Sequence, residues 1–133
     1  MDKTLKKIED FHGHLGPYVI LGYKMGLISN KILGKNPFEK KATIFTNIQP
    51  PHSCIIDGIQ LSSGCTTGKN NIKILNDENL KVIFSNKNGK NFEIALKNEI
   101  KNEIDTTITD ENIEEYSKKI WEKSNEELFD IIS

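Results

Sequence analysis

Apolar residues in the first third of the chain recur at helical spacing. A short amphipathic helix is predicted over residues 3–11, ending near Gly13, with a stripe of Leu5, Ile8 and Phe11. A second helix is predicted from Pro17, because proline suits the first helical position, where its missing amide hydrogen would have no partner. Gly34 is a fitting C-terminal stop for this helix, whose apolar stripe is Leu21, Met25, Ile28 and Ile32.

Gly22 and Gly26 lie four residues apart on the second predicted helix and therefore share one face. Glycine lowers helix propensity but lets a neighbouring backbone approach closely. We predict close packing at these two positions rather than contact with a ligand.

The middle of the chain alternates between strand and helix patterns. Residues 42–48 alternate in polarity and predict a strand, which a Pro-Pro pair ends. Residues 53–63 fit a short buried helix better than a strand, with Ser53 as its N-cap. Further strands are predicted over residues 72–75, 81–85 and 92–96, the last two joined by a hairpin at an Asn-Gly pair.

The last quarter of the chain is predicted to be helical. Ser124 and Glu127 form a capping box for a last helix that carries Leu128 and Ile131. The whole pattern predicts one α+β domain over residues 1–133. It combines a small antiparallel or mixed sheet with helices from the N-terminal and C-terminal ends.

Composition narrows the class of protein. A hydrophobic share of 36% beside 28% charged residues is typical of a soluble globular chain. No apolar run is long enough to span a membrane, and the charged N-terminus lacks the apolar stretch of a signal peptide, so a cytoplasmic protein is predicted. A net charge of −1 without a basic stripe argues against a nucleic-acid partner. Every basic residue is Lys, so ammonium groups or backbone amides must bind any anion.

Donor atoms suited to a transition metal gather before residue 70. Imidazole nitrogens of His12 and His14 with thiolate sulfurs of Cys54 and Cys65 would suit zinc. His12 and His14 are two positions apart, so their side chains share a face in extended backbone but not in a helix. His12 is therefore either a second ligand or a group that orients a ligand. The intervening helix is about 15 Å long, so the chain must fold back if both sulfurs are to reach one ion. A disulfide and two inert buried thiols are the alternatives.

Cys54 and Asp57 have second candidate roles at the start of the helix predicted over residues 53–63. The helix dipole is expected to lower the pKa of the Cys54 thiol, which favours a metal ligand and a nucleophile equally. Asp57 and His12 are the candidate general bases. Asp57 is otherwise a group that orients a histidine, or a solvated acid of the first turn.

A turn-rich segment follows over residues 64–71. It fails as a P-loop, because only three residues separate Gly64 from Gly68 and no Ser or Thr follows Lys69. The amides of Gly64 and Gly68, the Thr66 hydroxyl and the Lys69 ammonium are candidates to bind a small anionic ligand beside the metal. A plain tight turn is the alternative.

Four blocks of this sequence closely resemble motifs of the FmdE family, which is named for one of the subunits of formylmethanofuran dehydrogenase. In chain order they are residues 11–17 (FHGHLGP), 22–26 (GYKMG), 54–60 (CIIDGIQ) and 64–70 (GCTTGKN). The resemblance implies an α+β core that forms a homodimer with a metal-binding cleft. By position it points to His12, His14, Cys54 and Cys65 as ligands, with Asp57, Gln60, Thr66 and Lys69 lining the cleft.

Two departures limit what the resemblance implies. Lys24 stands where the family usually has Arg, so any bidentate contact made there is lost. No cysteine follows Cys65, so the sequence resembles the family core without the C-terminal zinc finger of longer members. Two cysteines also cannot hold an ordinary four-cysteine iron–sulfur cluster within one chain.

Three functional hypotheses follow. The first is a small cytoplasmic protein that binds zinc, with nickel or iron as alternatives, and is an accessory of the formylmethanofuran dehydrogenase complex in methanogenesis. The second is a stand-alone metal-dependent enzyme that acts on a small anionic ligand. The third is a thiol redox module in which Cys54 and Cys65 form a disulfide, which requires Cα atoms about 4.4–6.8 Å apart. The sequence leaves open whether the protein is itself an enzyme.

Overall fold

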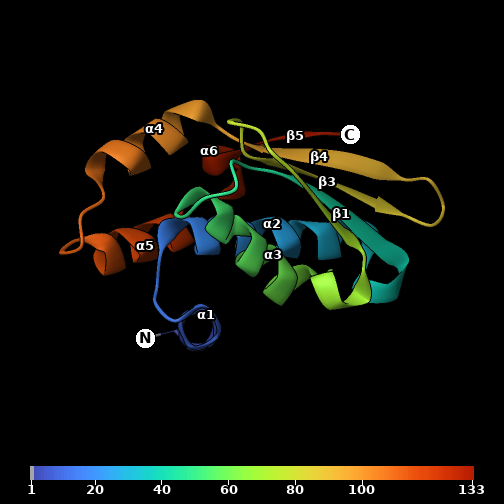
Figure 1. The fold of residues 1–133 in the computed structure, drawn as a ribbon, viewed down its shortest axis with the longest axis horizontal. Helices are drawn as coiled ribbons and strands as arrows, with labels where there is room; N and C mark the ends of the chain where they lie inside the picture. The colour runs from blue at the N-terminus through green and yellow to red at the C-terminus, as the bar shows by residue number, and fades with distance from the viewer. Residues whose placement is uncertain (1) are drawn as a thin grey trace.

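The structure is a computed structural model that describes residues 2–133, and its helices and single sheet form an α+β fold, as predicted (Figure 1). In chain order the helices and strands are α1 (Lys3–His12), α2 (Pro17–Leu33), β1 (Lys40–Phe45), α3 (Ile55–Ser63), β2 (Ile72–Leu75), β3 (Lys81–Asn86), β4 (Asn91–Leu96), α4 (Asn98–Thr107), α5 (Ile113–Glu122), α6 (Asn125–Leu128) and β5 (Phe129–Ile132). Short 3₁₀ turns lie at Pro37–Glu39, His52–Cys54 and Thr67–Lys69. No helix in the described residues is long and apolar enough to cross a membrane.

The sheet is mixed, with strand order β2-β1-β3-β4-β5. β1 and β2 run parallel, and every other neighbouring pair runs antiparallel. The predicted hairpin between β3 and β4 is confirmed, and Gly89 adopts a φ of 84° in its turn. One face of the sheet packs on the helices through alternate buried residues, which are Ala42, Ile44, Val82, Phe84, Phe92 and Ile94.

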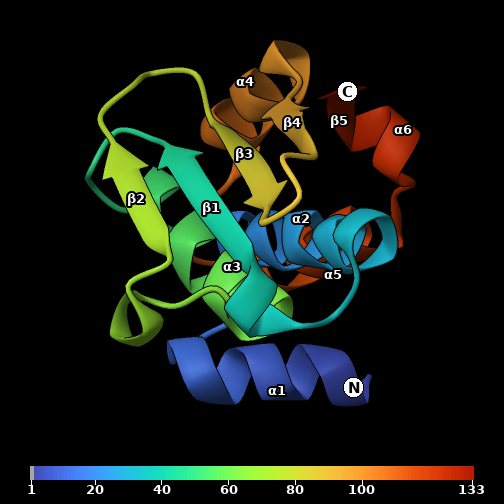
Figure 2. The ribbon, with the colours of Figure 1, turned by 90° about the vertical axis from the view of Figure 1, so that its right-hand side faces the viewer.

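The helix pair α2 and α3 lies between the sheet and α1. Two views at right angles place α1 on one side of this pair and the sheet on the other (Figures 1 and 2). α2 starts at Pro17 and is followed by Gly34, as predicted, and most of its residues are buried because it lies at the centre of the fold. α1 contributes Leu5 and Ile8 to the core and ends at Gly13, whose φ of 101° stops the helix.

α2 and α3 cross with their backbones in close contact. A Cβ added to Gly22 or Gly26 would come closer than 3.0 Å to the backbone of α3. A Cβ added to Gly58 would come equally close to the backbone of α2. The packing role predicted for Gly22 and Gly26 is therefore confirmed, and Gly58 provides the matching surface on α3.

Some predicted boundaries are wrong. Ser53 does not cap α3, because it lies inside a 3₁₀ turn that leads directly into the helix. β1 ends three residues earlier than predicted. The capping box of Ser124 and Glu127 is confirmed, but its helix is only four residues long. The following Phe129–Ile132 pairs with β4 as a strand, so Ile131 is not helical.

Candidate functional site

The His12 side chain is held at the junction of α1 and α3. His12 is the last residue of α1, and its Nδ1 lies 2.7 Å from Oδ2 of Asp57 in the first turn of α3. Only 9% of the His12 side chain is exposed. The carboxylate of Asp57 therefore orients the ring and leaves Nε2 outside this hydrogen bond.

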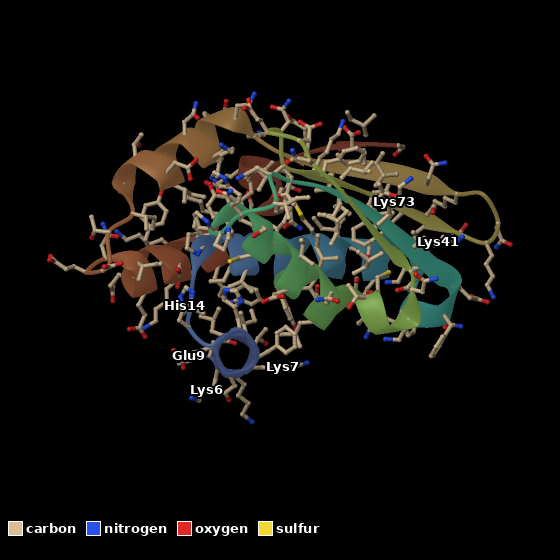
Figure 3. The ribbon with its side chains drawn as sticks, in the orientation of Figure 1. Lys6, Lys7, Glu9, His14, Lys41 and Lys73 are labelled. Carbon is tan, nitrogen blue, oxygen red and sulfur yellow. The ribbon has the colours of Figure 1, made fainter. Side chains whose placement is uncertain are left out.

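His14 and Cys54 lie beside His12. Because the chain turns at Gly13, the ring centroids of His12 and His14 are 4.9 Å apart. His14 lies between the end of α1 and the start of α2 (Figure 3). The two histidines and Cys54 line one small pocket of about 100 Å³, whose other walls are Gly16, Pro17, Tyr18, Val19, Pro50, Pro51 and Ile113.

The Cys54 thiol lies in the 3₁₀ turn before α3 and is partly buried. Burial raises its pKa, and the nearby Asp57 carboxylate raises it further. The prediction that the helix dipole lowers the pKa of this thiol is therefore wrong, since these two effects act in the opposite direction. The thiol is protonated at neutral pH, so any metal bound there must displace a proton.

Cys65 lies at the other end of α3. It is fully buried just beyond the helix, where its backbone N–H donates to Ser63 Oγ at 3.0 Å. Burial raises the pKa of its thiol, against the opposing effects of Ser63, Lys40 and Lys69. The nine residues of α3 span about 13 Å along the helix axis. The structure thus brings three of the four predicted ligands to one pocket and does not bring Cys65 to it.

The same separation bears on the redox hypothesis. Both cysteines are free thiols. A Cys54–Cys65 disulfide requires Cα atoms about 4.4–6.8 Å apart, whereas α3 keeps the two residues at opposite ends of a longer helix. A redox cycle between these two cysteines would require α3 to unfold.

The segment at residues 64–71 forms a compact turn at the same end of α3 as Cys65. Several of its backbone N–H groups already have partners, since Thr66 donates to Asn71 Oδ1, Thr67 to Gln60 Oε1 and Lys69 to Thr66 Oγ1. Gly64 has a φ of 79° and ends α3, whereas a Cβ added to Gly68 would meet Thr66 Oγ1 at 3.9 Å, an ordinary contact. The tight-turn alternative fits this geometry, and a ligand bound here would lie away from the His12 pocket.

A polar network that the sequence did not predict lies next to the His12 pocket. The Tyr18 hydroxyl donates to Asp105 Oδ1 at 2.5 Å, and His52 Nε2 lies 2.9 Å from Asp105 Oδ2. Burial by itself raises the pKa of Asp105, but the hydrogen bonds from Tyr18 and His52 outweigh it and lower that pKa. His52 Nδ1 is buried without a partner among the described residues.

The sequence marks His52 only as a residue type that can bind metal. Tyr18 and Asp105 carry no such signal, because they lie 87 residues apart in the sequence.

This network forms part of the wall of a cavity of about 460 Å³ between α2, α4 and the turn at Pro51 and His52. The remaining walls are apolar and come from Pro17, Pro51, Ile104, Ile108 and Ile113. Tyr18, Pro17, Pro51 and Ile113 also line the His12 pocket, so the two hollows adjoin. A cavity of this size with a few convergent polar groups is typical of a small-molecule site.

The donor chemistry of the His12 pocket fits a metal ion, although the site is not preassembled. Within residues 2–133, no group of three or more His, Cys, Asp or Glu side chains is positioned to hold one. Two imidazoles and one thiol are nevertheless zinc-type donors. The bond from Asp57 to His12 is also the contact that commonly orients a metal-bound histidine.

Comparison with known proteins places this chain in a family. The model of the family described as "FmdE, Molybdenum formylmethanofuran dehydrogenase operon" matches residues 11–130. The chain is also similar to a "Probable S-adenosyl-L-methionine-binding protein" of Archaeoglobus fulgidus, with 31% identity over 74 residues. That similarity covers 54% of this chain but only 20% of the relative, so the chain spans about a fifth of the relative's length. Because the family match covers nearly the whole described fold, the chain belongs to the FmdE family.

Proposed function

We propose that this chain is a metal-binding protein of the FmdE type, in which His12, His14 and Cys54 hold one zinc ion. The observation that carries the proposal is the His12–Asp57 hydrogen bond of 2.7 Å beside His14 and Cys54. A carboxylate on Nδ1 selects the tautomer whose Nε2 can bind a metal. His14 is exposed and lines the same pocket, so a turn of its ring would direct a nitrogen to an ion bound by His12 Nε2.

The donor set supports zinc over a hard cation. Two nitrogens and one sulfur suit a borderline-soft ion, and nickel or iron are the alternatives. Three protein ligands leave a fourth position for water, a substrate or a further ligand. Because Cys54 is protonated in the metal-free chain, binding releases its proton and should weaken as the pH falls.

The test is metal analysis of single variants. The purified protein, loaded separately with zinc, nickel and iron, is expected to retain about one zinc per chain after dialysis. His14→Ala and Cys54→Ser should lose the metal while their far-UV circular dichroism is unchanged. Cys65→Ser should keep it. Full zinc retention by Cys54→Ser, or equal loss in Cys65→Ser, would overturn the assignment of these ligands.

A second candidate function is metal-dependent catalysis on a small ligand. The specific observation in its favour is the 460 Å³ cavity that shares walls with the His12 pocket. Asp57 is then the general base, or His12 is the base if it does not bind the metal. A crystal structure of the zinc-loaded protein with anomalous data separates the candidates. Water at an open fourth position supports an enzyme, whereas four protein ligands sealed from solvent contradict it.

The family membership suggests a partner for the chain. We propose that the chain associates with the formylmethanofuran dehydrogenase complex as an accessory and that it forms a cytoplasmic homodimer. The family description, which refers to the operon of that enzyme, supports the association. The homodimer is proposed from the sequence resemblance, and the cytoplasmic location from the composition and the charged N-terminus. Affinity purification of the tagged chain from its native host should recover dehydrogenase subunits. Light scattering on the purified chain should give twice the 15.1 kDa chain mass. A monomeric mass would contradict the homodimer. A purified fraction without dehydrogenase subunits would contradict the association with that complex.

A further inference from the structure

A third cavity lies far from the His12 pocket, where β1 begins and β3 ends. It has a volume of about 480 Å³, within the range of small-molecule sites. Its walls are Phe38, Glu39, Lys40, Lys41, Lys69, Asn70, Asn71, Ser85, Asn86 and Lys87. Figure 3 shows that the two regions are well separated, with Lys41 on the sheet in the right half of the view and His14 in the left half.

Positive charge in this cavity is not compensated. The four lysines of its wall face a single acid, Glu39, and within residues 2–133 none of them forms an ion pair. Lys40 is only 2% exposed, and its ammonium donates to the neutral oxygens of Ser29 and Asn30. Ser29 and Asn30 belong to α2 and are not wall residues, so the exposed lysines Lys41, Lys69 and Lys87 supply the charge on the cavity side. The wall is therefore complementary to an anion.

An aromatic ring is exposed at the edge of this cavity. Phe38 is 71% exposed, which is the highest value among the large apolar side chains of the described residues. A 3₁₀ turn holds its backbone, since the Phe38 N–H donates to Asn36 Oδ1 at 3.0 Å. The Lys69 Nζ lies 5.8 Å from the ring centroid. An exposed ring beside ammonium groups can stack on a planar ligand whose anionic part meets the lysines.

We propose that this cavity binds a phosphorylated small molecule with a planar heteroaromatic ring, such as a nucleoside diphosphate. Lys41, Lys69 and Lys87 receive the phosphates as point charges, because the chain has no Arg for bidentate contacts. Phe38 stacks on the ring. The site is independent of the proposed metal site and shares none of its residues.

Isothermal titration calorimetry with ADP, adenosine and inorganic pyrophosphate tests both parts of the proposal. ADP is expected to bind at least about tenfold more tightly than either fragment, since it alone meets both the lysines and the ring. Raising the NaCl concentration from about 50 to about 300 mM should weaken ADP and pyrophosphate but not adenosine.

Variants separate the two contacts. Lys69→Ala and Lys87→Ala should each weaken ADP and pyrophosphate binding about three- to tenfold and leave adenosine unchanged. Phe38→Ala should weaken ADP and adenosine and leave pyrophosphate unchanged. Lys7→Ala is the matched control, because Lys7 is an exposed lysine on α1, away from Lys41 (Figure 3).

Three results would overturn the proposal. They are no ADP binding at millimolar concentration, an equal effect of Lys7→Ala and Lys69→Ala, or no effect of Phe38→Ala on ADP. Zinc content separately tests the proposed metal site, so a failure of ADP binding can be told apart from a failure of zinc binding. Phe38→Ala and Lys69→Ala should retain zinc whether or not ADP binds.

Discussion

His12 Nδ1 lies 2.7 Å from Asp57 Oδ2, and this contact joins the end of α1 to the first turn of α3 across 45 residues of sequence. The two residues come from separate blocks of the family pattern. The fold brings them together because α1 packs under the α2–α3 pair through Leu5 and Ile8. The pair therefore links the packing of the N-terminal helix to the orientation of a candidate metal ligand.

Asp57→Asn should weaken zinc binding about 10- to 100-fold, because the neutral amide no longer favours the tautomer of His12 whose Nε2 is free to bind. Competition with a chromogenic chelator gives the affinity. Asp110→Asn is the control, since Asp110 is exposed and has no hydrogen bond to its side chain in the described residues. Equal zinc affinity in Asp57→Asn and the unmodified chain would show that the carboxylate does not act through His12.

Gly58→Ala should destabilise the fold by about 1–3 kcal/mol or more, because the added methyl group would overlap the backbone of α2. Urea unfolding measures the change in free energy. Gly68→Ala is the matched control, since its nearest neighbour, Thr66 Oγ1, would lie at an ordinary contact distance of 3.9 Å. Equal stability of the two variants would disprove the close crossing of α2 and α3.

The two thiols should differ in reactivity in the metal-free protein. Cys54 is partly exposed and should react with Ellman's reagent in the native state, whereas buried Cys65 should react only after unfolding. The Cys54 rate should keep rising with pH beyond 9.0, the ordinary thiol pKa, because burial and Asp57 raise that pKa. A rate that levels off near neutral pH would contradict the raised pKa. Rapid native-state formation of a Cys54–Cys65 disulfide would contradict their separation by α3.

Asp105→Asn should lower thermal stability at neutral pH, and the difference should shrink in acid. The pKa of Asp105 is lowered in the fold, mainly by the hydrogen bonds from Tyr18 and His52, which outweigh burial. Its ionised form therefore stabilises the fold above the ordinary Asp value of 3.8, and this contribution is lost as the pH falls through the lower folded pKa. Melting curves from neutral pH down to about pH 3 measure it. A constant difference between the two proteins would contradict the linkage.

Local patterns predicted much of the fold. The end of α1 at Gly13 and the two ends of α2 at Pro17 and Gly34 follow from the backbone preferences of glycine and proline. These preferences are local and do not depend on the rest of the fold. The packing of Gly22 and Gly26 was also predictable, because a missing side chain on a buried helix face leaves room for another backbone. The end of the chain was harder to predict. Phe129–Ile132 became a strand because the edge of β4 was open to pairing, and that edge depends on the whole sheet.

The α+β class, the family and the candidate donor residues before residue 70 could be predicted from the sequence, since these depend on residue type and short-range order. Which of those candidate residues lie together depends on how the helices pack. The tertiary structure placed His12, His14 and Cys54 around one pocket and Cys65 at the far end of α3, because a rigid helix keeps its ends apart. It also brought Tyr18 to Asp105, a contact between distant segments that no local pattern encodes.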